Sequence, residues 1–277
     1  MKIITLLENN TCNDALVPKH GMSLYIESES RKILFDIGPD DSFVKNAHAL
    51  GVDLSAVQYL IISHGHYDHG GALNHFARVN QQAKIFMHRT ARYQRVARGL
   101  KNDYREIGLK FDAALNERIL FLDNNYPIDD HASIVMNFDG EGFVPNGNRS
   151  LFEKGPDGSL HNDAFKHEIA LIIDESGRHV FFTGCSHSGI SNMMNTTRQY
   201  LGGRNIDYVI GGFHIYNPAT KSLEQKDRID TLIAELEQFQ HTIFYTGHCT
   251  STDGYGYLKQ RLKSAVREFH SGSVIHI

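Results

Sequence analysis

Four side chains of types that bind metal ions lie within six residues, directly after an apolar segment. Residues 59–62 form the apolar run, and the sequence then reads Ser63-His64-Gly65-His66-Tyr67-Asp68-His69. In a tight turn, side chains at alternate positions converge, so we expect His64 and His66 to share one ion. Asp68 and His69, at the start of a following helix, are expected to face a neighbouring ion. Imidazole and carboxylate ligands together suit zinc, iron or manganese.

A solvated histidine-rich loop is the alternative, but the order His-x-His-x-Asp-His after an apolar strand argues against it. Four ligands cannot complete the coordination of two metal ions, because each catalytic ion usually holds at least three protein ligands. Two later β-runs end in similar turns, Thr183-Gly184-Cys185-Ser186-His187 and Thr246-Gly247-His248-Cys249. We predict His187 and His248 as the completing ligands. Cys185 is either a thiolate ligand or bridge, or a small buried residue beside the site, and Cys249 is expected to be structural.

Two further residues at the ends of β-runs are candidates for supporting roles. His214 follows the run 208–210 and two glycines, and it is interpreted as a substrate-binding or proton-transfer residue. A metal ligand and a packed core histidine are the alternatives for His214. Asp36 ends the early run 32–35 and either orients a metal-bound histidine or caps a turn.

The composition is ordinary for a folded globular protein, and the expected partner is a small-molecule substrate. The chain has 277 residues, 41% hydrophobic and 22% charged, with a formal net charge of −4 and no run of more than two basic residues. That charge balance argues against a nucleic-acid partner. No segment approaches the roughly 18–20 apolar residues of a membrane span, so a cytoplasmic location is expected. Three cysteines argue against a disulfide framework, and assembly into a homo-oligomer is left open.

The pattern of the chain predicts many short strands with a few helices between them in one domain over 1–277. A segment at about 90–165 is polar, weakly periodic and expected to be an embellishment on the substrate side, with a loop at 141–158. Hairpins are expected at 29–31 and 174–177. Strands are predicted at 2–7, 23–27, 32–35, 59–62, 84–87, 118–122, 133–138, 168–173, 179–183, 208–210, 242–246 and 273–276. Helices are predicted at 41–50, 70–79, 222–239 and 257–269.

The motif at 64–69 resembles the hallmark of the metallo-β-lactamase superfamily, and the strand end at Asp36 is similar to another of its motifs. The resemblance implies an α/β (α+β) fold, the αββα sandwich of two mixed sheets with external helices. Most members carry an aspartate after Thr-Gly, where this chain has Cys185. The Thr-Gly-Cys-Ser-His, Gly-Gly-Phe-His and His-Cys-Thr segments are similar to a branch related to the dihydropterin ribofuranosyl-aminobenzene-phosphate synthase.

Three functions follow from these observations. The first is a hydrolase in which two divalent ions, Zn²⁺ or else Mn²⁺ or Fe, activate a hydroxide toward a phosphoester, ester or related small substrate. In it Asp68 would orient the nucleophile, His214 would transfer a proton, and the His20-Gly21 loop would close one side of the pocket. The second is a transferase like the synthase, and the third is a non-catalytic metal-binding sensor. Basic residues that would help the transferase bind a diphosphate are Arg89, Arg92, Arg95, Arg98, Lys101 and Arg105. Arg92, Arg95 and Arg98 are spaced as one helix face, for which a solvated charged surface is the alternative.

Overall fold

The computed structural model describes residues 1–29 and 31–277, and the chain forms two compact units. Unit 1 comprises residues 1–93, 107–123 and 269–277, and unit 2 comprises residues 94–106 and 124–268. Each unit contains a seven-stranded sheet. The hairpin expected at 29–31 includes Ser30, which lies outside the described residues. The prediction of one domain over 1–277 stays a prediction.

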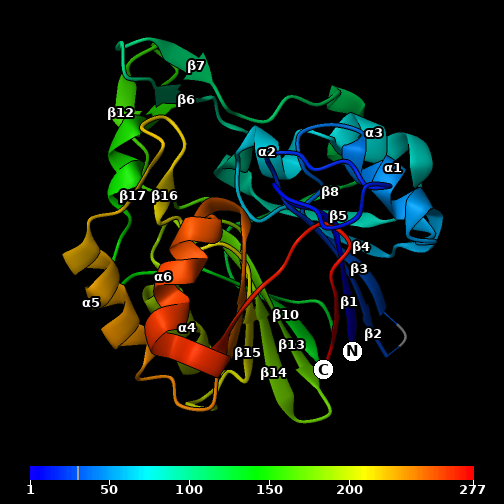
Figure 1. Ribbon diagram of the computed structural model, residues 1–277. Helices are drawn as coiled ribbons and strands as arrows, with labels where there is room; N and C mark the ends of the chain where they lie inside the picture. The colour runs from blue at the N-terminus through cyan, green and yellow to red at the C-terminus, as the bar shows by residue number, and fades with distance from the viewer. Residues whose placement is uncertain (30) are drawn as a thin grey trace. The chain divides into compact units, whose positions relative to one another are not determined.

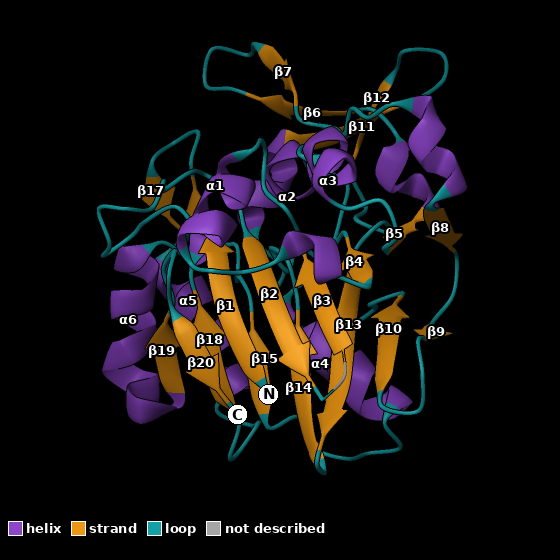
Figure 2. Cartoon of the chain, turned by 90° about the vertical axis from the view of Figure 1, so that its right-hand side faces the viewer, coloured by secondary structure: helices purple, strands orange, loops and turns teal. Residues whose placement is uncertain are grey.

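The sheet of unit 1 has the order β20-β1-β2-β3-β4-β5-β8. Neighbours from β20 to β3 are antiparallel, and neighbours from β3 to β8 are parallel. Figure 2 shows β1, β2 and β3 side by side. The strands are β1 (Lys2–Leu7), β2 (Ser23–Ser28), β3 (Arg31–Phe35), β4 (Tyr59–Ile61), β5 (Lys84–His88), β8 (Ile119–Leu122) and β20 (Val274–His276).

The helices of unit 1 bury their apolar faces against this sheet. Phe43 of α1 and Phe76 of α3 share one core with Leu34 and Leu60 of the central strands, and none of the four is exposed to solvent. Burial of such side chains contributes about 1.5–3 kcal/mol each. Gly51 follows the end of α1, with φ of 69°. The helices are α1 (Ser42–Ala49), α2 (Tyr67–Gly70) and α3 (Leu73–Val79), with 3₁₀ turns η1 (Leu54–Ala56), η2 (Arg89–Arg92) and η3 (Ala113–Glu117).

The sheet of unit 2 has the order β19-β18-β15-β14-β13-β10-β9 and is also mixed. Figure 1 shows β10, β13, β14 and β15 next to one another. The hairpin expected at 174–177 joins β13 to β14, with positive φ at both Ser176 and Gly177, as tight hairpin turns require. The strands are β9 (Tyr126–Pro127), β10 (Ala132–Met136), β13 (Ile169–Glu175), β14 (Arg178–Phe182), β15 (Tyr208–Ile210), β18 (Ile243–Thr246) and β19 (Val266–Glu268).

Three helices cover one face of the unit 2 sheet (Figure 1). Met193 of α4, Leu232 of α5 and Leu258 of α6 share a core with Phe181 and Phe244 of the strands. The helices are α4 (Ile190–Tyr200), α5 (Lys226–Leu236) and α6 (Thr252–Leu262), with 3₁₀ turns η4 (Asn146–Ser150), η5 (His248–Thr250) and η6 (Lys263–Ala265). Two small sheets complete the unit: β7 (Tyr104–Glu106), β6 (Arg95–Arg98), β11 (Leu151–Lys154) and β12 (Leu160–Asn162) in one, β16 (Tyr216–Asn217) and β17 (Ser222–Leu223) in the other.

The expected mixed α/β class with two mixed sheets is confirmed, and several boundaries were wrong. The helix predicted at 257–269 ends at Leu262, because Lys263 has φ of 49° and β19 follows. The helix predicted at 222–239 begins only at Lys226, after β17. The helix predicted at 70–79 begins only at Leu73 as α3, since Gly70 is the last residue of α2, and the loop predicted at 141–158 contains η4 and β11. Helix α4 was not predicted.

Among the described residues, no helix combines the length and the apolar character needed to cross a membrane.

Candidate metal centre

Unit 1 places the four predicted ligands at the carboxyl end of β4. The strand ends at Ile61, and the extended His66 precedes α2, whose first turn contains Asp68 and His69. The side chains of His64 and His69 are fully buried, and those of His66 and Asp68 are almost so. A strand followed at once by a short helix therefore gathers all four side chains at one sheet edge.

Asp36 holds two of these histidines in a fixed orientation. It follows the neighbouring parallel strand β3, and its Oδ1 accepts the backbone N–H of Ser63 at 2.7 Å. Its Oδ2 accepts the Ser63 hydroxyl at 2.7 Å and lies 2.6 Å from His69 Nδ1. The Ser63 hydroxyl lies 2.9 Å from His64 Nδ1. A metal would therefore bind both rings through Nε2, and carboxylates commonly orient metal-bound histidines in this way.

The packing of the three imidazoles fits a metal ion. His64 Nε2 and His66 Nδ1 lie 3.0 Å apart, and the His64 ring centroid is 4.5 Å from that of His66 and 4.2 Å from that of His69. Two nitrogens that bind the same zinc ion, each at about 2.0–2.1 Å from it, are separated by roughly 3 Å. Because burial of several polar rings is costly without partners, this cluster is suited to a cation.

His20 joins the unit 1 cluster from the loop before β2. Its Nε2 lies 3.2 Å from Asp68 Oδ2, and its side chain is partly exposed. Gly21, with φ of 147°, permits this approach, since a Cβ there would lie only 2.5 Å from the Asp68 carbonyl oxygen. The loop at His20 therefore contacts Asp68. Its predicted role of closing one side of the pocket stays a prediction.

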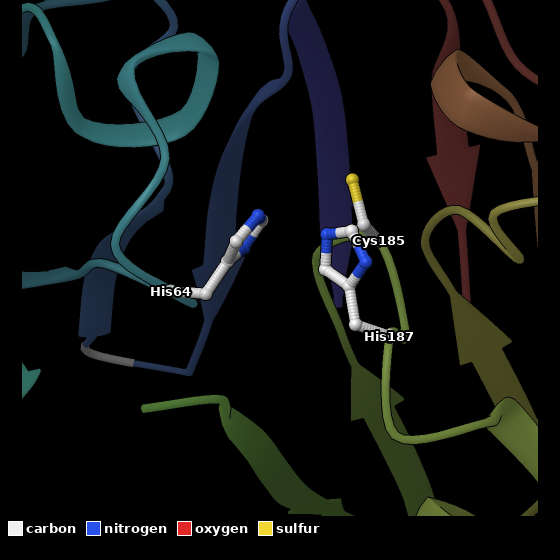
Figure 3. A group of neighbouring side chains, drawn as sticks. All are labelled: His64, Cys185 and His187. Atoms are coloured by element: carbon white, nitrogen blue, oxygen red, sulfur yellow. The ribbon is translucent and has the colours of Figure 1, made fainter. Parts of the chain in front are cut away.

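Unit 2 brings its candidates together because parallel strands end at one sheet edge. Phe182 of β14 is paired with Ile210 of β15, which is paired with Tyr245 of β18. The turns after these strands carry the candidate side chains Cys185, His187, His214, His248 and Cys249. Figure 3 shows Cys185 and His187 in the turn after β14, and His64 after β4 of unit 1.

Cys185 lies at the centre of the unit 2 candidates. Its Sγ is within 4.8 Å of a ring nitrogen of His187 and within 4.8 Å of one of His248. All three side chains are buried. A thiolate at this position would reach ions bound by either histidine, and both interpretations of Cys185 stay predictions.

His187 is held by residues that the sequence did not indicate. Its Nδ1 lies 2.9 Å from Asn148 Oδ1, and the Asn148 amide donates to the His187 carbonyl oxygen at 2.8 Å. Glu168 accepts the N–H groups of His187 and Ser188, both at 2.7 Å. Burial raises the pKa of Glu168 to about 7, although these two donors oppose the rise. Asn148 therefore turns Nε2 of His187 toward any metal, and no spacing pattern links the two residues.

Replacement of Asn148 by alanine is expected to weaken zinc binding by about 10–100-fold, the usual cost of losing a partner that orients a metal-bound histidine. Titration against a competing chelator measures the zinc affinity. The exposed Asn195→Ala variant on α4 is the matched control and should bind zinc as the unchanged protein does. Equal affinity in Asn148→Ala and Asn195→Ala would show that His187 needs no such partner.

His214 and Cys249 form a second group around Cys185. The His214 backbone N–H donates to Cys249 Sγ at 3.3 Å, and the ligand atoms of Cys185, His214 and Cys249 lie within 4.8 Å of one another. Burial raises the pKa of the Cys249 thiol, but hydrogen bonds with Cys185 and His214 outweigh it and hold the pKa well below its usual range. Cys249 thus has polar contacts beyond the structural role expected of it. The ring centroids of His214 and His187 are 4.1 Å apart.

The arginines expected to bind a diphosphate do not form a helix face. Arg92 ends η2, whereas Arg95 and Arg98 lie on β6. Arg92 packs over the Phe121 ring and Arg98 over the Phe152 ring. The Arg95 side chain is fully buried and bonded to Asp163. The helix prediction was wrong because a spacing of three residues arises equally where a turn is followed by a strand.

Comparison with known proteins agrees with this geometry. The family model of the metallo-beta-lactamase superfamily matches residues 16–193, which include Asp36 and the whole His64–His69 motif. The chain belongs to the metallo-β-lactamase superfamily. Within it, a curated relative from Methanocaldococcus jannaschii is 27% identical, with 99% of this chain and 96% of the relative covered. That relative is named 7,8-dihydropterin-6-methyl-4-(beta-D-ribofuranosyl)-aminobenzene-5'-phosphate synthase.

Two solved structures share the fold of this chain. Tm1679, described as a metal-dependent hydrolase of the β-lactamase superfamily, superposes with a TM-score of 0.83 at 25% identity, covering 100% of this chain and 99% of that one. Zn²⁺-bound PqqB from Methylobacterium extorquens superposes with a TM-score of 0.58 at 12% identity, covering 100% of both chains. The second likeness concerns the fold alone.

Proposed function

We propose that this protein is a metal-dependent hydrolase that acts on a small phosphoester, ester or related substrate through two divalent ions. The proposed metal ligands are His64, His66, Asp68 and His69 within unit 1, and Cys185, His187 and His248 within unit 2. The observation that carries the proposal is the buried imidazole cluster in which Asp36 and Ser63 hold the Nδ1 atoms of His69 and His64. Such support of metal ligands is typical of working metal sites.

The donor set favours zinc over manganese. Imidazole and thiolate ligands suit Zn²⁺, whereas sites rich in carboxylate and water suit Mn²⁺. The bound ions would supply Lewis-acid activation of water and stabilisation of the anionic transition state. Asp68 would orient the attacking water, because its carboxylate is nearly buried and is contacted by His20 at 3.2 Å. His214 would transfer a proton, since its buried Nδ1 has no hydrogen-bond partner among the described residues.

The proposal includes a cytoplasmic location. The partner is a small-molecule substrate, without a nucleic acid or a membrane, and formation of a homo-oligomer is compatible with it. The similarity to Tm1679, which is described as a hydrolase, supports the reaction class. The similarity over nearly the whole chain to a synthase favours a second candidate, a transferase that joins a phosphorylated ribosyl unit to an aminobenzoate.

Hydrolysis of a panel of chromogenic substrates by the zinc-loaded protein tests the first candidate. The panel should contain bis(p-nitrophenyl) phosphate, a p-nitrophenyl ester, a thioester and a lactone, and His66→Ala is the inactive control. Turnover of one member that is lost in His66→Ala supports a hydrolase. Release of diphosphate from a ribosyl diphosphate donor only when 4-aminobenzoate is present, without turnover of the panel, would instead support the transferase.

A further inference from the structure

A cavity of about 320 Å³ lies beside His187 in unit 2. Its volume is at the lower end of the range of small-molecule sites, about 300–1,000 Å³. His187 and Asn148 form part of its wall, and Phe138 and Phe165 add aromatic surface. The Phe165 ring stacks on His187, with the centroids 4.3 Å apart and the planes 10° from parallel. A ligand in this cavity would therefore contact both aromatic rings and a proposed metal ligand.

Arg149 brings a positive charge to the same wall. Its side chain also lines an adjoining cavity of about 460 Å³, and it is exposed. Within residues 1–29 and 31–277 no hydrogen bond or ion pair occupies its guanidinium group. Nearby arginines differ, because Arg95 is bonded to Asp163 and Arg228 is bonded to Glu224 and to the Val144 carbonyl oxygen. Arg149 thus has its five N–H donors available for a ligand.

The segment that carries Arg149 is fixed relative to His187. Asn146 donates through its backbone N–H and its amide to Glu224 at 2.7 and 3.0 Å. Asn148, adjacent to Arg149, is bonded to the ring and to the carbonyl oxygen of His187. The Ser150 hydroxyl closes the turn by donating to the Gly147 carbonyl oxygen at 2.8 Å. A guanidinium on such a segment can position a ligand relative to the His187 ring rather than merely attract it.

The remaining charges of the cavity are consistent with a bound anion. Asp163 is neutralised by Arg95 at 2.9 Å and by His167 at 3.1 Å. Asp139 is exposed at the edge and has no recorded ion pair among the described residues. Glu141 and Glu235 line the adjoining cavity together with Arg149, and Glu235 accepts hydrogen bonds from the Phe143 backbone N–H and the Ser191 hydroxyl. The carboxylates around Arg149 are therefore solvated or already hydrogen-bonded to other groups.

We propose that Arg149 is a substrate-binding residue that takes an anionic oxygen group, phosphate or carboxylate, of a substrate whose planar ring lies against Phe138 and Phe165. This inference rests on the proposed function, because it assigns the substrate class of the same site. The fork of Arg149 would bind two oxygens of the anion at once, as arginine does with phosphates and carboxylates. The reacting bond would then be held next to His187.

The test measures binding of small probes to the zinc-loaded protein by calorimetry. The probes are phenyl phosphate, benzoate and the neutral benzyl alcohol. In Arg149→Gln the Kd of the preferred anion should rise at least tenfold, while benzyl alcohol should bind equally to both proteins. Arg149→Lys, which keeps the charge but loses the fork, should fall between them. Arg178 is exposed at the opposite end of β14, so Arg178→Gln is the matched control. It should bind the anions with the same Kd as the unchanged protein.

The two anions distinguish the sources of the charge. A large effect with phenyl phosphate alone assigns a phosphate subsite, and one with benzoate alone assigns a carboxylate subsite. An unchanged Kd for both anions in Arg149→Gln would overturn the inference, because the metals alone would then account for anion binding. Failure of the proposed function is separate: it would appear as zinc missing from the unchanged protein, whereas Arg149→Gln should retain its full zinc content.

Discussion

Substitution of Asp163 by asparagine is expected to lower the free energy of unfolding by about 3–5 kcal/mol. Asp163 Oδ2 accepts a hydrogen bond from Arg95 Nε at 2.9 Å, and the side chains of both residues are almost completely buried. Removal of one partner leaves a charge in the interior, which costs this amount in buried ion pairs. The second partner of Arg95 is Glu153, which is partly exposed and cannot replace the lost carboxylate. Urea unfolding followed by circular dichroism measures the difference.

The dependence on pH gives this prediction a sharper form. Burial raises the pKa of Asp163, but His167 and Arg95 outweigh it and hold the pKa well below its usual value of 3.8. A carboxyl group with a lowered pKa in the folded state stabilises the protein above the unfolded-state pKa and loses this contribution as the pH falls through the folded-state pKa. The difference between the two proteins should therefore be constant from pH 7 to about pH 5 and shrink below about pH 4.

A matched control is available on the surface of the same unit. Asp130→Asn changes an exposed carboxylate, so it should alter stability by less than about 0.5 kcal/mol. If Asp163→Asn proved as stable as Asp130→Asn, the buried ion pair would not stabilise the contact between β6 and the segment before β13, and the prediction would be contradicted.

Substitution of Asp68 by asparagine is expected to lower kcat by about 10³-fold with little change in KM. Positioned groups that handle protons contribute about 10²–10⁴-fold to catalysis. Asparagine keeps the shape of Asp68 but replaces one carboxylate oxygen by an amide nitrogen, which cannot accept a hydrogen bond or bind a metal. His20→Gln, which removes the ring 3.2 Å from Asp68, should lower kcat by a smaller factor.

The kinetics of Asp68→Asn should be measured on protein whose metal content is known, with the exposed Asp41→Asn as control. Activity of Asp68→Asn within threefold of the unchanged protein would exclude the proposed role in orienting the nucleophile. A similarly large loss of kcat in Asp41→Asn would show that removal of any carboxylate near α1, which Asp41 precedes, lowers activity, and not the loss of Asp68 in particular.

The local parts of the fold and site could be predicted from the sequence. The candidate ligands of unit 1 lie within six residues, so their meeting at the end of β4 depends only on the adjacent turn. The hairpin at Ser176-Gly177 was predictable for the same reason, since positive φ is confined to the turn itself. The ends of parallel strands likewise brought Cys185, His187 and His248 to one edge once the sheet was assumed.

Long-range contacts and polar helices could not be predicted in this way. Asn148 and Glu168 hold His187 from 39 and 19 residues away, and no spacing marks such a pairing. Helix α4 contains Asn192 and Thr197 among its buried residues, which obscures the apolar stripe that indicates a helix. The apolar pattern through Val266 continued past the end of α6, because nothing in the residue type of Lys263 indicated its left-handed backbone.

Elemental analysis of protein purified without chelators, together with His66→Ala, tests the central claim most directly. The two ligand sets predict about two equivalents of zinc, or of manganese or iron, in the unchanged protein. In His66→Ala the content should fall to one equivalent or less, since His66 lies 3.0 Å from His64 Nε2 in the buried cluster. Less than half an equivalent in the unchanged protein, unaltered by the substitution and not recovered on reconstitution, would contradict a metal-dependent enzyme.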